Sequence, residues 1–239
     1  MGRLILVRHA QASFLSQNYD QLSPLGETQA RLLGEHWAQR KMAFDRVCTG
    51  PAVRHRHTAQ IVKETYRKED LAFPEPVILD AFDEFQGEKV LAESLPILLE
   101  RDSAIRELHN AMQKSSNQTA KRANFQKLFG QVILMWATGS ITAPTAEPWD
   151  EFCARVDRGL RSFLTDSGKG ESVMIFTSGG PLAVVVRRAL HLSTEDTLQI
   201  AWMLRNCSFT EFLYSRDRLT LSSFNAFPHL DEDSLLTYR

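Results

Sequence analysis

The chain begins with a continuous run of branched apolar residues, Leu4-Ile5-Leu6-Val7, which ends at a charged pair, Arg8-His9. A run without polar alternation is typical of a strand that is buried on both faces, as in a parallel sheet covered by helices. A helical pattern follows from about 24 to 40, with an apolar face and with Ser23 as its expected N-cap. The start of the chain therefore predicts a strand that delivers an arginine and a histidine to one edge of a sheet.

The alternation of strands and helices continues along the chain and predicts the fold class. A second apolar run and a turn at 49–51 precede another helical pattern, and this order of elements is that of a parallel sheet. We therefore expect a three-layer α/β/α sandwich with a mostly parallel central sheet. After the first strand, the expected strands lie at 44–48, 77–79 and 173–176, with a closing hairpin at 207–214 and 219–224, and the expected helices lie at 52–66, at 149–164 and after Gly180.

One segment interrupts this order of elements. From about 89 to 147, helical stretches at 93–108 and 123–137 flank a polar patch at 113–121. We interpret this segment as a helical insertion within a single domain, 1–239, and expect it to determine substrate specificity. An apolar helix in such an insertion can pack in a core or against a second copy, so a homodimer is among the expectations. The last ten residues are expected to form a tail.

The composition fits a compact protein without a strong overall charge. Of the 239 residues, 43% are hydrophobic, and the formal net charge is −1. No global basic field therefore exists to attract nucleic acid or an anionic membrane, so an anion must be recognised locally. The three cysteines, Cys48, Cys153 and Cys207, form no disulfide or zinc pattern. The first apolar run is too short for a signal peptide and no stretch reaches membrane-spanning length, so we expect a cytoplasmic protein without a membrane partner.

Three stretches are expected at the carboxyl ends of strands, where the loops of an open α/β sheet converge on ligands. They are Arg8-His9, 49–54 and 177–180, and two of them contain an arginine, Arg8 or Arg54. Guanidinium groups match phosphate oxygens, and the start of a helix adds positive field, so the pattern predicts a pocket for a phosphate dianion. Positive neighbours lower the pKa of a histidine, which would make His9 neutral and nucleophilic near pH 7.

A nucleophilic histidine in a phosphate pocket indicates phosphoryl transfer through a covalent phosphohistidine. The leaving alcohol then needs a proton from a general acid. The loop "DAFDEFQGE" offers Asp83, Glu84 and Glu88, and neighbouring carboxylates can keep one of their number protonated.

The ordered motifs resemble those of the histidine phosphatase superfamily, in its phosphoglycerate-mutase-like branch. The motifs are "LVRHAQ", "LSPLGETQARLLG", "GPAVRHRHTAQ", a glutamate-bearing loop, a strand that runs into a Gly-Gly turn, and a late "HL"; they cover about 4–84 and 147–230. The resemblance implies that His9 is the nucleophile, that Arg8 and Arg54 bind phosphate and that Glu84 is the acid. It implies neither a metal nor another cofactor.

Two positions depart from the family pattern. Ala10 stands where the family usually has glycine after the Arg-His pair, which matters little if the backbone angle φ there is negative. Ser178 stands where the family usually has a second histidine, in Ser-His-Gly-Gly. The loss of one preorganised donor costs roughly 3 to 4 kcal/mol of transition-state stabilisation, or about a hundred- to a thousandfold in rate.

Several groups could compensate for this loss. The Ser178 hydroxyl and the amide of Gly179 can donate to a phosphoryl oxygen, although Ser178 is equally suited to cap the following helix. His57 lies three residues after Arg54 and is expected to share its helix face.

The sequence therefore predicts a metal-independent phosphatase that hydrolyses a phosphomonoester, on a small molecule or a phosphoprotein, through His9. Two alternatives remain. One is mutase-type phosphoryl transfer, although Leu15 lies in the neighbourhood where glycolytic mutases usually have asparagine. The other is a phosphate-binding module that has lost turnover together with the second histidine.

Overall fold

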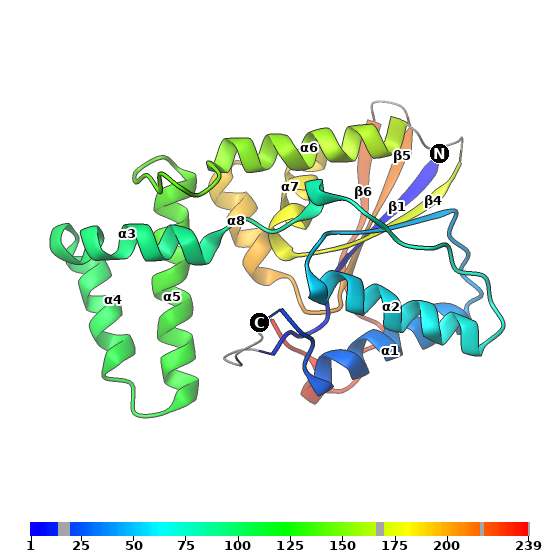
Figure 1. Cartoon of the computed structure of the whole chain (residues 1–239), viewed down its shortest axis with the longest axis horizontal. Coiled ribbons are helices and arrows are strands. Elements are labelled where there is room, and N and C mark those ends of the chain that lie inside the picture. The colour runs from blue at the N-terminus through cyan, green and yellow to red at the C-terminus, as the bar shows by residue number, and fades with distance from the viewer. Residues whose placement is uncertain (14–19, 166–169, 216–217, 239) are drawn as a thin grey trace. The chain divides into compact units, whose positions relative to one another are not determined.

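A computed structural model describes residues 1–13, 20–165, 170–215 and 218–238. Within them the chain forms a six-stranded sheet with the order β3-β2-β4-β1-β5-β6 (Figure 1). The three contacts among β1, β2, β3 and β4 are parallel, and β5 and β6 extend the sheet antiparallel to β1. The strands are β1 Gly2–Arg8, β2 Arg46–Thr49, β3 Val77–Ile78, β4 Ser172–Thr177, β5 Phe209–Ser215 and β6 Arg218–Ala226.

Helices flank this sheet on both sides, which confirms the predicted fold class. Helices α1 and α2 pack together against one face, and α7 packs against the other (Figure 1). A short 3-10 turn, Asp80–Phe82, follows β3. The helices are α1 Pro24–Gln39, α2 Val53–Lys68, α3 Gly87–Arg101, α4 Ser103–Gln113, α5 Gln118–Ala137, α6 Trp149–Thr165, α7 Gly179–Leu190 and α8 Thr194–Met203.

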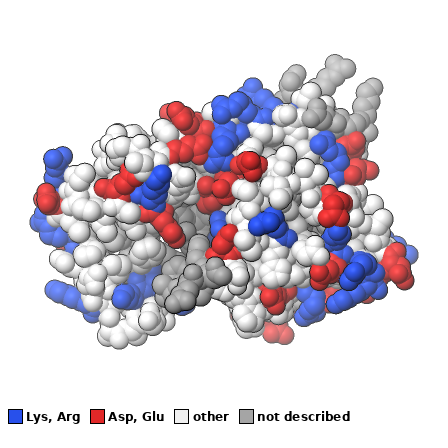
Figure 2. All heavy atoms as spheres, in the orientation of Figure 1, with Lys and Arg blue, Asp and Glu red and all other residues white. Residues whose placement is uncertain are grey.

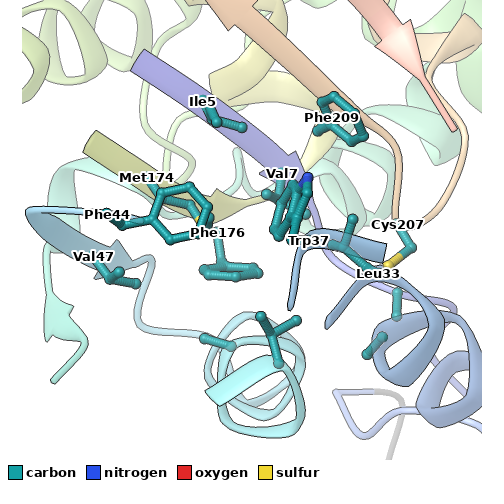
Figure 3. Close-up of a cluster of buried hydrophobic side chains, with 14 of the residues drawn as sticks. Ile5, Val7, Leu33, Trp37, Phe44, Val47, Met174, Phe176, Cys207 and Phe209 are labelled. Carbon is teal, nitrogen blue, oxygen red and sulfur yellow. The ribbon is translucent and has the colours of Figure 1, made fainter. Parts of the chain in front are cut away.

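The core beneath α1 and α2 explains why β1 is a continuous apolar run. Ile5 and Val7 point toward α1 and α2, while the alternate residues of β1 are also fully buried, as expected for a strand covered on both faces (Figure 3). Trp37 of α1 lies at the centre of this cluster. Its ring centroid is 5.6 Å from that of Phe44 and 5.4 Å from that of Phe209. Burial of these aromatic rings fixes α1 against the sheet.

The chain divides into two compact units, residues 1–84 with 155–239 and residues 85–154. The second unit contains the predicted insertion and is built from α3, α4, α5 and the first residues of α6. The prediction of one helical stretch over 93–108 is wrong, because the helix ends at Asp102. This carboxylate accepts hydrogen bonds from the amides of Ala104, at 2.8 Å, and Ile105, at 3.1 Å, and so starts α4 in a new direction.

The C-terminal part of the chain contains two features that the sequence patterns did not predict. Helix α8 begins at the N-cap Ser193, whose hydroxyl accepts from the Asp196 amide at 3.0 Å. The expected tail is attached to the first unit: the Asn206 amide donates to the Thr237 carbonyl at 2.8 Å, and the side chain of Gln29 donates to the Leu235 carbonyl at 2.7 Å. Long-range backbone contacts of this kind leave no local pattern in the sequence.

The surface agrees with the balanced composition. On the face drawn in Figure 2, lysine and arginine side chains are interspersed with aspartate and glutamate among the described residues. None of the helices in the described ranges has the length and apolar character needed to cross a membrane.

A close approach of α1 and α2 yields a stability prediction at Gly34. A Cβ added there would lie 2.8 Å from the Cβ of Thr65, which is closer than packed atoms can approach. In an exposed helix, glycine to alanine stabilises by roughly 1 kcal/mol. We expect Gly34→Ala to do the opposite and to lower the free energy of unfolding by about 1 to 3 kcal/mol, because the two helices must separate. Urea unfolding measures the sign, and a more stable variant would contradict the close contact.

Candidate active site

The carboxyl ends of β1 and β4 lie side by side and place the Arg8-His9 pair next to the start of α7. Arg8 is in register with Thr177, and the His9 amide donates to the Thr177 carbonyl at 2.8 Å. On the other side, the Cys207 amide lies 3.1 Å from the carbonyl oxygens of both Arg8 and His9. The backbone of the pair is therefore held from two directions before any side-chain contact is made.

The His9 imidazole is buried and has one defined hydrogen bond. Its Nδ1 lies 2.8 Å from the carbonyl oxygen of Ala10. A carbonyl oxygen can only accept, so Nδ1 carries the proton and the lone pair of a neutral ring is on Nε2. Burial first, and then the charges of Arg54 and Arg8, hold the pKa of His9 well below its usual range. Ala10 is not among the described residues with positive φ, so replacing the family's glycine introduces no left-handed strain.

Both predicted phosphate-binding arginines lie at the same end of the sheet as His9: Arg8 precedes it at the end of β1, and Arg54 contacts the Ser178 hydroxyl, which also contacts the neighbouring His55. The Arg8 guanidinium donates through Nη1 to the carbonyl of Leu204, at the end of α8. The Arg54 guanidinium, on the first turn of α2, donates through Nη1 to Asp20 at 2.7 Å and through Nη2 to the Ser178 hydroxyl at 3.2 Å. Asp20 also accepts from the amide of Val53 at 2.8 Å, so one carboxylate holds both the helix start and the arginine.

Ser178 occupies the N-cap position of α7 without capping it. Its side chain makes no hydrogen bond to the first turn of the helix, so the expectation that it caps α7 is wrong. The hydroxyl instead contacts Arg54 and, at 2.6 Å, Nε2 of His55. At the next position, a Cβ added to Gly179 would lie 3.3 Å from the Ala201 carbonyl oxygen. Glycine therefore lets α7 approach the end of α8 closely.

Of the three carboxylates proposed as acids, the structure brings Glu84 to the start of α7. Its Oε2 accepts from the Gly180 amide at 3.1 Å. Asp83 holds the same loop through its Oδ1, which accepts from the Glu84 amide at 2.9 Å. Glu88 is exposed on α3, in the second compact unit.

An arginine and a threonine fix the backbone of this loop. Arg155 of α6 donates through Nη1 to the carbonyl oxygens of Asp80 at 3.1 Å and Ala81 at 3.0 Å. The Thr177 hydroxyl donates to the Phe82 carbonyl at 2.7 Å, which ties the loop to the end of β4. The position of Glu84 is therefore determined by groups on both sides.

His55, which the sequence reasoning did not select, is buried at the site. Its side chain is 0% exposed, and its ring centroid is 5.6 Å from that of His9. Burial, and after it the charge of Arg54, hold the pKa of His55 well below its usual range. His57, the histidine expected from its spacing to Arg54, is only half-buried and makes no hydrogen bond to a site residue among the described positions.

A sequence signal for His55 does exist. It lies on the buried stripe of α2 with Thr58, Ala59 and Val62, at the spacing of one helix face. No comparable signal exists for Asp20, which approaches α2 from a different part of the chain. Among the described residues, no group of three or more His, Cys, Asp or Glu side chains is arranged as metal ligands.

These motifs and this geometry define the class of protein. The chain belongs to the histidine phosphatase superfamily, branch 1, whose family pattern matches residues 4–89 and 86–226. The predicted superfamily is thereby confirmed, and the prediction of a phosphatase-type enzyme is confirmed at the level of this family. Leu15, which bears on the mutase alternative, lies outside the described residues.

Individual relatives agree with this assignment. The chain is 26% identical over 239 residues to a Hydrogenobacter thermophilus protein named "Putative phosphoserine phosphatase 2", with 96% of this chain and 98% of that protein covered. A mycobacterial glucosyl-3-phosphoglycerate phosphatase in complex with inorganic phosphate has a similar structure, with a TM-score of 0.61, 18% identity and coverage of 96% and 99% of the two chains. A phosphoglycerate mutase from Bacillus anthracis gives a TM-score of 0.60 at 16% identity, with 96% and 95% covered. The two structures support the shared fold.

The buried histidines predict how stability depends on pH. In the folded state the pKa of His9 and of His55 lies well below the unfolded value of 6.5. Below about pH 6.5 the unfolded chain therefore binds more protons, and stability falls as the pH falls. We expect the free energy of unfolding to decrease between pH 7 and 5.5, by up to ~1.4 kcal/mol per pH unit for each histidine. Urea unfolding at several pH values tests this, with His55→Gln expected to show a smaller slope; stability that increases on acidification would contradict it.

Proposed function

We propose that the protein is a metal-independent phosphatase that hydrolyses a phosphomonoester through a phosphohistidine at Nε2 of His9. The observation that carries the proposal is the hydrogen bond from Nδ1 to the Ala10 carbonyl, because it leaves the Nε2 lone pair available on a ring kept neutral by its surroundings. Arg8 and Arg54 lie beside the same ring and match the oxygens of a phosphoryl group.

The first step transfers the phosphoryl group to the enzyme. Nε2 of His9 attacks phosphorus in line with the ester oxygen, a P–N bond forms, and the P–O bond to the alcohol breaks. The two guanidinium groups and the Gly179 amide at the start of α7 stabilise the charge on the equatorial oxygens. A proton moves from the Glu84 carboxyl to the leaving oxygen, so the alcohol departs neutral.

The second step returns the enzyme to its starting state. The Glu84 carboxylate accepts a proton from a water molecule as that water attacks phosphorus, the P–N bond breaks, and inorganic phosphate leaves. His9 is again neutral, with its proton on Nδ1. Neither step requires a metal ion, because the charge stabilisation comes from arginines and a backbone amide.

The substrate we propose is a small phosphorylated metabolite. Phosphoserine is the first compound to test, because the relative from Hydrogenobacter thermophilus carries that activity in its name and covers nearly the whole chain. A phosphate-binding module without turnover is the second candidate function. The replacement of the second histidine by Ser178 favours it, since a neutral hydroxyl brings no positive charge to the transition state.

The nucleophile is tested by replacing His9. We expect wild-type protein to hydrolyse phosphoserine or an aryl phosphate in excess chelator, and His9→Ala to lower kcat by at least about 10³-fold, because no other group replaces the nucleophile. Rapid acid-free quenching with a radiolabelled substrate should show an acid-labile label on the wild type and none on His9→Ala. His57→Gln serves as the matched control and should retain full activity.

Each alternative has its own result. Isomerisation of 3-phosphoglycerate without net hydrolysis would establish a mutase. An absence of turnover, with inorganic phosphate still raising the melting temperature of the wild type, would establish the binding module.

The role of Glu84 predicts a dependence on the leaving group. A nitrophenolate leaves without help, whereas the alkoxide of phosphoserine must be protonated. We therefore expect Glu84→Gln to lower kcat for phosphoserine by about 10²-fold to 10⁴-fold and to lower kcat for nitrophenyl phosphate much less. Equal losses for both substrates would exclude Glu84 as the general acid, and Glu88→Gln, on the exposed face of α3, should change neither rate.

A further inference from the structure

We infer that His55 is a positioning residue that acts through Ser178, and that the pair orients the Arg54 guanidinium at the place where the family carries its second active-site histidine, position 178. This inference rests on the proposed function, since it assigns a role in the same phosphate site. It differs from that function in the residues and in the element involved: the imidazole comes from α2, and the hydroxyl that holds Arg54 comes from the end of β4.

The contact between the two side chains is buried and short. Nε2 of His55 lies 2.6 Å from the Ser178 hydroxyl oxygen, and both residues are at most 1% exposed. Gly50 lies beside the His55 ring, and a Cβ added to it would lie 2.4 Å from Nδ1 of His55. Glycine at this position provides the space for an imidazole, which therefore has little freedom to rotate away from Ser178.

The hydrogen bonds at Ser178 determine the direction of its proton. A hydroxyl has two accepting lone pairs and one proton to donate. Arg54 donates through Nη2 to one lone pair, at 3.2 Å. The Gly50 backbone hydrogen-bonds the His55 ring and raises its pKa, which only a carbonyl acceptor does, so the ring proton belongs on Nδ1. Nε2 then carries a lone pair, and the Ser178 hydroxyl donates to it.

A hydroxyl that donates to His55 keeps its lone pairs for Arg54. The Ser178 side chain does not cap α7, so the helix does not determine the direction of its proton. Without His55, the hydroxyl could rotate and donate in several directions. With its proton held by His55, it is a fixed acceptor for Nη2 of Arg54 and orients that guanidinium.

A double-mutant cycle on kcat tests this role. We expect His55→Leu, which fills the space without an acceptor, to lower kcat by about 10-fold to 100-fold, and Ser178→Ala to lower it at least as much. Because His55 acts through the hydroxyl, the double variant should be no slower than Ser178→Ala. His55→Gln keeps an acceptor, its amide oxygen, near the position of Nε2 and should retain activity within about threefold of the wild type, whereas a purely structural role would not distinguish Gln from Leu.

Additive losses in the cycle, or a His55→Leu variant with wild-type kcat, would overturn the inference. Thermal unfolding confirms that each variant is folded, and His57→Gln is the control on the same helix. The wild-type rate and the His9→Ala rate decide the proposed function separately. If the wild type shows no turnover, the same cycle is measured on stabilisation by inorganic phosphate, where a non-additive loss supports the coupling of His55 to Ser178 and additive losses overturn it.

Discussion

The parallel pairing of β1 with β4 is the interaction on which the rest of the site depends. Its last rung is the hydrogen bond from the His9 amide to the Thr177 carbonyl, 2.8 Å long, which ends both strands at the same level. The nucleophile follows one strand directly and Ser178 follows the other, so α7 begins beside the imidazole. Because parallel strands end at one edge of the sheet, the amides at the helix start point to the same place as the side chains that follow β1. A shift of this register by one residue would move His9 to the opposite face of the sheet.

Placing two arginines beside a buried histidine has opposite effects on catalysis and on stability. Both effects come from the same cause, since burial and the charges of Arg54 and Arg8 disfavour the imidazolium form of His9. A neutral ring is what nucleophilic attack requires. Because the buried ring resists protonation, the folded chain binds protons less readily than the unfolded chain. Lowering the pH therefore lowers the free energy of unfolding. Asp20 moderates the positive charge of Arg54, because its carboxylate lies 2.7 Å from the guanidinium at the partly exposed rim.

The sequence was sufficient for those parts of the fold and site that have a local pattern. The apolar run before Arg8 predicts a buried strand, and the Arg-His pair is attached to its end by the chain itself. The contact of His55 with Ser178 spans 123 positions, and that of Arg54 with Asp20 spans 34. Such pairs depend on how α2 is seated on the sheet, which the spacing of histidines in one helix does not specify. For the same reason the spacing to Arg54 favours His57, whereas the histidine that contacts Ser178 is His55, on the buried stripe of α2.

A missing residue in a family motif is therefore weak evidence for a missing function when it is assessed from one segment alone. A side chain can reach the space of a histidine at position 178 either from the end of β4 or from the first turn of α2. A small residue at the end of β4 leaves room for a larger residue on α2, and Gly50, which has no side chain, leaves room for the His55 ring. What differs is the charge: a buried His55 beside Arg54 stays neutral, so the pair orients Arg54 through the Ser178 hydroxyl and the two arginines must provide the positive charge. The two guanidinium groups then carry a larger share of the transition-state stabilisation than they would beside an imidazolium.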